Sequence, residues 1–477
     1  MVNYPHHPAS FRDPSGFVFR ANDGFYRQVN PSYAEDYECL MNSGLYRALT
    51  EKGLLIPHTE IPENLSGSPD WYKTLHPLQL PFISYAYEWS FDQLRDAALL
   101  TLRIMGMAMD HGMILKDATP FNIQFHKGKP VFIDTLSFEK HVVTRPWVAY
   151  RQFCECFLYP LYLEHYKGLG PQKILTAWPE GIPAGVTAGL LPLKSCLNVG
   201  VWMHIRLQNM IGPGAGQRSR GQRKGAQEVS SEGKAGTGQG GFSQQKLRHL
   251  VQNLETIVKG LRPKAATNST WNNYYGTTIL SRDYLDEKTK IFRQFIGSIP
   301  FTSALDIGSN EGFFSRILAE KNVRVLAVDS DPACIADLYR TVREKNIPNI
   351  LPLCIDLSNP SPAIGFRNAE RSSFTERARA ELVIALALVH HLVLTKNIPF
   401  ADIADYLTSL TTDYLIIEFV PLEDEKAQEL IRNKETFHKP YDAASFKEQL
   451  ARHFSIEREA PVPGTARILF LMKKREA

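Results

Sequence analysis

Residues 305–314, Leu-Asp-Ile-Gly-Ser-Asn-Glu-Gly-Phe-Phe, combine small, acidic and amide side chains at a spacing that suits ligand binding. Gly308 and Gly312 allow the backbone to turn sharply and to approach a ligand closely. Asn310 tolerates left-handed backbone geometry, so it can stand where a third glycine often stands. Amides at the start of the next helix can donate to a ligand, and Asp306 adds a carboxylate suited to a cationic amino-acid group. The segment predicts a binding loop between a strand and a helix.

Two further acids end the next two predicted strands. Asp329 lies twenty-three residues after Asp306, where it can accept hydrogen bonds from both hydroxyls of a ribose. Asp356 ends the third predicted strand. The G-x-G-x-x-G spacing of nicotinamide sites is absent, because the two glycines are four residues apart and an acid precedes the first. The combination of loop and acids is therefore more specific than the loop by itself.

The pattern D-x-G-x-N-x-G, with both later acids, resembles the class I S-adenosylmethionine (SAM) dependent methyltransferase family from about residue 271 to residue 472. The resemblance implies SAM as the cofactor, with Asp306 near its methionine part and Asp329 at its ribose. Asp356 would approach the adenine amino group, with Leu357 beside the ring. The loop residues implied to line the site are Gly308, Ser309, Asn310 and Gly312. A structural turn in another α/β fold is the alternative.

Three residues at strand ends are candidates for catalysis. The sulfonium of SAM is already an excellent leaving group, so the reaction needs mainly in-line positioning and sometimes a base. His390 and His391 follow the fourth predicted strand and are the candidate bases. Alternatively, one histidine caps the next helix and the other lines the SAM pocket. Glu418 ends the fifth predicted strand and either orients the acceptor or fixes a loop.

Aromatic residues precede the glycine loop, at Trp271, Tyr274, Tyr275 and Tyr284, with Lys288 four residues further on. Aromatic rings at this place can close over SAM and attract its sulfonium by cation–π interaction. The alternative is a helix and loop that pack against the domain and contact no ligand. The sequence favours the second interpretation.

A second pattern occurs in the N-terminal half, where the segment 111–122 is followed by Phe-Ile-Asp at 132–134. The spacing of Asp117, Asn122 and Asp134 resembles the catalytic loop and metal-binding acid of the protein-kinase-like and aminoglycoside-phosphotransferase-like fold. In an active site of this kind, Asp117 would accept a hydroxyl proton, and Asn122 and Asp134 would hold the Mg²⁺ of Mg-ATP. The phosphate-covering glycine loop and the strand lysine are not visible, and Arg27 is a poor substitute. We expect a kinase-like scaffold that binds or positions the acceptor.

Strands and helices alternate along the C-terminal half. The predicted strands are 303–307, 323–329, 349–356, 381–388 and 414–420, with helices at 311–320 and 332–345. This alternation predicts an α/β fold with a Rossmann-like doubly wound sheet. Hairpins at 16–29 and 122–134, with helices at 91–110 and 150–166, predict a preceding α+β kinase-like domain.

Composition divides the chain. Ten of the thirty residues from 212 to 241 are glycine, with five basic and two acidic residues. Such a segment cannot offset its ordering entropy by burial, so it is predicted as a flexible linker, with an RNA-binding tether as the alternative. The predicted domains are therefore a kinase-like domain (1–211), the linker (212–242) and a methyltransferase domain (243–477).

Overall composition limits the function classes. The net charge of +4 is too small to argue for nucleic acid. Six sparse cysteines favour a reducing cytosol. No apolar run reaches about 18 residues, so we expect a cytoplasmic protein without a membrane span. The two-part arrangement resembles bacterial methyltransferase-like proteins, some of them associated with nodulation or saccharide modification.

The sequence therefore predicts an enzyme that methylates a small molecule or a saccharide. A protein with an additional phosphotransferase activity is one alternative. A non-catalytic SAM-binding or RNA-binding module is the other. The acceptor atom and the oligomeric state stay open.

Overall fold

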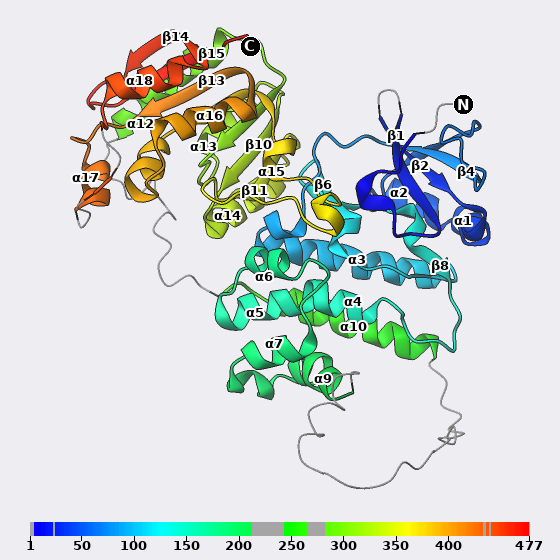
Figure 1. Ribbon diagram of the computed structural model, residues 1–477. Coiled ribbons are helices and arrows are strands. Elements are labelled where there is room, and N and C mark those ends of the chain that lie inside the picture. The colour runs from blue at the N-terminus through cyan, green and yellow to red at the C-terminus, as the bar shows by residue number, and fades with distance from the viewer. Residues whose placement is uncertain are drawn as a thin grey trace, which may run out of the picture.

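The computed structural model describes residues 4–21, 24–211, 243–264, 282–432, 436–437 and 440–476. The predicted linker 212–242 and the aromatic segment 270–275 lie outside these residues. Figure 1 shows an N-terminal part with a small sheet and many helices, beside a C-terminal part built around one larger sheet. In the described part of the chain, no helix is both long and apolar enough to cross a membrane.

A four-stranded antiparallel sheet opens the N-terminal part, in the order β1-β2-β4-β3. Its strands are β1 (Gly16–Ala21), β2 (Gly24–Val29), β3 (His58–Ile61) and β4 (Lys73–Pro77). Helices α1 (Ala34–Asn42) and α2 (Leu45–Glu51) connect β2 to β3. The hairpin predicted at 16–29 is present as β1 and β2.

Helices and short strands form the rest of the N-terminal part. Its longest helix, α3 (Phe91–Asp110), begins at a capping box between Ser90 and Gln93. The short strands are β5 (Met113–Leu115), β6 (Ile123–His126), β7 (Lys129–Phe132) and β8 (Phe138–Lys140). The helix predicted at 150–166 is observed as α4 (Tyr150–Phe153), a π-helical turn η6 (Cys154–Leu158) and α5 (Tyr159–Lys167). The further helical segments are α6 (Pro171–Ala177), α7 (Ala184–Leu190), η7 (Leu193–Leu197), α8 (Val199–Val201), η8 (Trp202–Arg206) and α9 (Leu207–Ile211). The α+β class is as predicted; the kinase-like fold stays a prediction.

Helix α10 (Gln244–Gly260) lies at the start of the predicted methyltransferase domain (243–477). It packs against α3 of the N-terminal part. Gln244 donates to the Met109 carbonyl at 3.2 Å, and Arg248 pairs with Asp110 at 2.8 Å. The apolar face of α10 is thus covered by the N-terminal part, and we propose that the boundary between the two parts falls within residues 265–281.

The C-terminal part contains a seven-stranded sheet in the order β11-β10-β9-β12-β13-β15-β14. Its strands are β9 (Ser303–Ile307), β10 (Arg324–Asp329), β11 (Ile350–Cys354), β12 (Ala380–Ala385), β13 (Thr411–Phe419), β14 (Phe454–Pro461) and β15 (Ile468–Lys474). The first five strands run parallel, and β15 is antiparallel to both of its neighbours. The helices include α12 (Arg282–Gly297), α13 (Phe313–Ala319), α14 (Pro332–Glu344), α15 (Phe374–Arg377), α16 (Phe400–Leu410), α17 (Glu425–Ile431) and α18 (Ala443–Ala451). The predicted doubly wound sheet is confirmed, and its order reverses between β9 and β12, where such sheets bind ligands.

Charged side chains join the two parts. On α14, Arg340 pairs with Asp92 and Arg343 pairs with Asp96, both on α3. At the end of α15, Arg377 pairs with Glu88 and donates to the Ile83 carbonyl at 2.6 Å. Glu88 is fully buried, so this pair carries a desolvated charge across the contact between the two parts.

We predict that Arg377→Ala destabilises the protein by about 3 kcal/mol or more, because it leaves the buried carboxylate of Glu88 without its cation. The midpoint of urea unfolding measures the loss. The matched control is Arg293→Ala, which breaks an exposed pair with Glu320 and should cost less than about 1 kcal/mol. Equal effects of the two variants would contradict a stabilising role for the Arg377–Glu88 pair.

Candidate functional site

The loop between β9 and α13 has the conformation that its sequence favours. Gly308, Asn310 and Gly312 all have left-handed backbone angles, with φ of 75°, 50° and 73°. The Gly308 and Ser309 amides donate to the Val328 carbonyl at 2.8 and 3.0 Å, which holds the loop against β10. A Cβ on Gly312 would lie 2.4 Å from the Leu338 side chain. Only glycine therefore fits where the loop enters α13.

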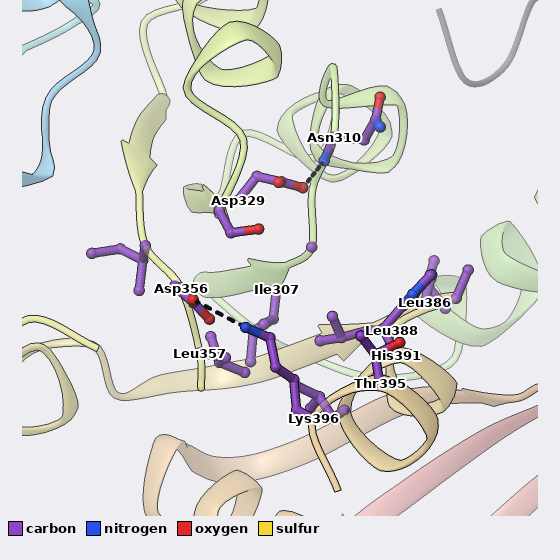
Figure 2. Close-up of a pocket in the computed structure, with 15 residues that line it drawn as sticks. Ile307, Asn310, Asp329, Asp356, Leu357, Leu386, Leu388, His391, Thr395 and Lys396 are labelled. Carbon is purple, nitrogen blue, oxygen red and sulfur yellow. Dashed lines mark hydrogen bonds and ion pairs between the residues drawn. The ribbon is translucent and has the colours of Figure 1, made fainter. Parts of the chain in front are cut away.

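Asp329, at the end of β10, is held by backbone amides of two loops (Figure 2). Its Oδ2 accepts from the Asn310 amide at 2.8 Å, and its Oδ1 accepts from the Asp331 amide at 2.9 Å. Burial raises the pKa of the Asp329 carboxyl, and the amide hydrogen bonds oppose that rise. The loop of the first strand and the acid of the second are thus fixed relative to each other.

A pocket of about 290 Å³ opens at this edge of the sheet. Its walls are drawn in Figure 2 and consist of Ile307, Gly308, Asn310, Asp329, Ser330, Ile355, Asp356, Leu357, Leu386, Ala387, Leu388, His391, Leu392, Thr395 and Lys396. Six of the predicted site residues are among them. Five others, Asp306, Ser309, Gly312, His390 and Glu418, are buried and do not line the pocket.

Asp356 and Lys396 face each other across one side of the pocket. The Asp356 carboxylate accepts from the amide and the hydroxyl of Ser358 at 2.9 and 2.6 Å. The Lys396 ammonium lies 3.8 Å from the other carboxylate oxygen. Lys396 and Thr395 were missed by the sequence reasoning, because residues 391–395 form a π-helical turn, η10 (His391–Thr395), that has no local signature.

Asp306 lies beneath the loop. Its carboxylate accepts from the Ser315 hydroxyl at 2.5 Å, and the residue is buried. Burial raises the pKa of Asp306 to about 7. This carboxyl therefore sits close to the pH at which it gains or loses its proton.

The adjacent histidines have different surroundings. His391 lines the pocket, and burial lowers its pKa to about 4, so its ring is neutral near pH 7. His390 is buried, and among the described residues neither of its ring nitrogens has a hydrogen-bond partner. Its side chain makes no capping hydrogen bond to η10. Of the two candidate bases, His391 is the one that reaches the pocket.

Glu418, at the end of β13, is fully buried and already has three donors. Lys288 donates to its Oε2 at 2.5 Å, Tyr284 donates to its Oε1 at 3.0 Å, and the Ala387 amide donates to Oε2 at 2.7 Å. Although burial raises the pKa of Glu418, the charges of Lys288 and Arg467 hold it below its usual value. The geometry favours the interpretation that Glu418 fixes a loop.

The loop that Glu418 holds is part of the pocket wall. Ala387 has a φ of 51°, which is unfavourable for a residue with a Cβ. Its neighbours Leu386 and Leu388 also line the pocket. The sequence predicted a strand through residue 388, whereas β12 ends at Ala385. The hydrogen bond from the Ala387 amide to Glu418 offsets this strain. It holds residues 386–388 in place as part of the pocket wall.

In the N-terminal part, the kinase-like residues gather around Ser137. The Ser137 hydroxyl donates to Asp134 at 2.5 Å and accepts from Asn122 at 3.1 Å. Arg27 pairs with the same Asp134 carboxylate. Burial raises the pKa of Asp117, and the charge of Asp134 adds to the rise. Among the described residues, no group of three His, Cys, Asp or Glu side chains is arranged to hold a metal ion.

The strand order defines a Rossmann-like doubly wound fold, with the glycine loop and Asp329 together at the carboxyl edge of its sheet. The chain is 30% identical over 473 residues to the nodulation protein NoeA of Rhizobium meliloti (strain 1021), covering 98% of this chain and 96% of that protein. The chain belongs to the family of this nodulation protein. No protein-family profile matches the chain.

Two solved methyltransferase structures are similar to part of the chain. Magnesium protoporphyrin IX methyltransferase from Synechocystis PCC 6803 is 16% identical with a TM-score of 0.32, covering 44% of this chain and 95% of that one. The N-methyltransferase NodS from Bradyrhizobium japonicum WM9 is 15% identical with a TM-score of 0.32, covering 44% of this chain and 94% of that one. Both were solved with S-adenosylhomocysteine bound.

We predict that Glu418→Gln destabilises the protein by about 3 kcal/mol, because it leaves the ammonium of Lys288 buried without its carboxylate. The double variant Lys288→Met/Glu418→Gln should recover at least half of this loss in urea unfolding, since both charges are then removed. Glu459→Gln, which breaks the more exposed pair with Lys447, is the control and should have little effect. A Glu418→Gln protein that is as stable as the parent would contradict the loop-fixing role.

Proposed function

We propose that this protein transfers a methyl group from SAM to a small molecule or a saccharide. The observation that carries the proposal is the pocket at the reversal of strand order, where the Gly308 loop, Asp329 and Asp356 meet. Ligands bind at this edge of doubly wound sheets. A relative named as a nodulation protein agrees with an acceptor of this class.

The residues of the pocket are chemically suited to SAM. Asp329 offers carboxylate oxygens to the hydroxyls of a ribose, and Leu357 and Leu388 offer apolar walls for a purine ring. A Cβ on Gly308 would lie 3.3 Å from Leu388, so the glycine keeps space open at the wall. When bound, SAM supplies a methyl group on a sulfonium, a very good leaving group.

The chain itself then has to orient the acceptor, exclude water and accept a proton. His391 is neutral near pH 7 because burial lowers its pKa to about 4, so its imidazole is unprotonated at the pocket wall, although the same lowering makes it a weak base. Glu418 acts through the Ala387 loop. We assign His391 as the candidate base and Glu418 as a positioning residue.

For the N-terminal part, we propose a binding or positioning role in preference to phosphoryl transfer. Arg27 already neutralises Asp134, so a magnesium ion would have to displace a partly buried ion pair. Calorimetric titration with Mg-ATP tests this role. Saturable binding of Mg-ATP would restore the bifunctional alternative.

We predict that Asp329→Ala weakens SAM binding roughly 100-fold, about 2.7 kcal/mol, because the ribose hydroxyls and the Asn310 amide both lose their acceptor. Isothermal titration calorimetry measures the affinity, and circular dichroism checks that the variant is folded. Asp413→Ala, on the exposed side of β13, is the matched control. Unchanged affinity in a folded Asp329→Ala protein would refute the assigned site.

We predict that SAM affinity rises severalfold, roughly fivefold, between pH 6 and pH 8. Because the pKa of Asp306 is about 7, this carboxyl is largely protonated at pH 6, and a cationic ligand nearby favours its ionised form. Binding at pH 6 should therefore release a proton, which titrations in two buffers of different ionisation enthalpy detect. Asp306→Asn should bind without this pH dependence, and an unchanged pH dependence in that variant would exclude Asp306 as its source.

A further inference from the structure

An exposed apolar surface lies on the short helices that precede residue 212. Leu193 and Leu197 at the two ends of η7 are 85% and 90% exposed, and Val199 is 71% exposed. Trp202, at the start of η8, is 51% exposed. We call these four residues the η7–η8 surface. Large apolar side chains that are this exposed and that follow one another within a short stretch of the chain indicate a contact surface for a partner.

The η7–η8 surface is not needed for the packing of the domain. The inner sides of the same segments already bury Ser195, Val201 and Ile205. Gly200 lies so close to its neighbours that a Cβ there would be 2.5 Å from the Tyr162 hydroxyl. The helices are thus seated on the domain by their inner faces, and the outer leucines and tryptophan project from it.

The charged residues carried by this stretch of the chain have one sign. Lys194 lies within η7 and is exposed, and Arg206, which ends η8, is half-buried. In the sequence, no aspartate or glutamate occurs from residue 181 to residue 227. Apolar side chains accompanied by cations, with tryptophan at the boundary, are the combination that binds the headgroup region of anionic membranes.

We propose that the η7–η8 surface binds the chain peripherally to a membrane that contains anionic lipids. A symmetric contact with a second copy would bring the cations of both copies, Lys194 and Arg206, into one interface, and this stretch of the chain supplies no acidic residue to pair with them. Anionic headgroups complement the same charges, while single projecting leucines insert between lipid chains. In Figure 1, α7 and α9 lie at the end of the molecule away from the C-terminal sheet, so such a contact leaves the pocket accessible.

The test is co-sedimentation of the full chain with vesicles of phosphatidylcholine and phosphatidylglycerol, compared with vesicles of phosphatidylcholine alone. The chain should bind the anionic vesicles more tightly, and added salt should weaken that binding. Leu193→Ser/Leu197→Ser should weaken it at least about tenfold, and Lys194→Glu should weaken it severalfold. Leu78→Ser/Phe366→Ser, which changes exposed apolar residues outside the surface, is the matched control and should bind like the parent.

Circular dichroism and the SAM titration check that each variant is folded, so a loss of vesicle binding reports on the surface itself. Failure of the parent chain to bind anionic vesicles overturns the proposal. Binding that the Leu193→Ser/Leu197→Ser variant retains also overturns it. The mass in solution, from light scattering, distinguishes the other occupant: a dimer that the same double variant converts to a monomer, without vesicle binding by the parent, would identify a contact between copies.

Discussion

Glu418 is a fully buried carboxylate, and its charge is stable in that place because donors from separate elements surround it. Tyr284 and Lys288 come from α12, before the sheet begins, and Ala387 comes from the loop after β12. Arg467, just before β15, donates to Tyr284 at 2.9 Å and forms two hydrogen bonds with Asp424. One charge thus ties the helix before the sheet, the pocket wall and the reversed strand together. A change in this network therefore alters the support of the pocket wall formed by residues 386–388.

The other side of the pocket is supported from the N-terminal part. Helix α14 begins three residues after Asp329, and it carries the arginines that pair with Asp92 and Asp96 on α3. Tyr339, on the same helix, donates to Asp96 at 2.9 Å and packs edge-on against Phe125 of β6. The N-terminal part therefore fixes the helix that follows Asp329, independently of any activity of its own.

Local patterns predicted the parts of this arrangement that depend on nearby residues. The glycine loop, its left-handed Asn310 and the acid that ends β10 follow from strand periodicity and backbone sterics. Asp356, predicted to end the third strand, lies two residues beyond the end of β11 at Cys354. Local patterns do not predict the role of Glu418, because its partner Lys288 lies 130 residues away in the sequence. The sequence predicts Ala387 as part of a strand for the same reason, since the carboxylate that accepts from its amide is distant in the sequence. The position of α10 also depends on a distant partner, α3.

In the N-terminal part, too, a local pattern omits a partner that is distant in the sequence. Asp117, Asn122 and Asp134 have the spacing of a phosphotransferase site, and Ser137 brings Asn122 and Asp134 together. This spacing does not include Arg27, which lies on β2, far away in the sequence. The guanidinium of Arg27 pairs with Asp134, the acid that the pattern predicts as a metal ligand. Although burial raises the pKa of Asp134, Arg27 and Ser137 hold it below its usual value, so the carboxylate is ionised without a metal ion. The arginine places a positive charge at this carboxylate, which supports the proposed binding or positioning role over phosphoryl transfer.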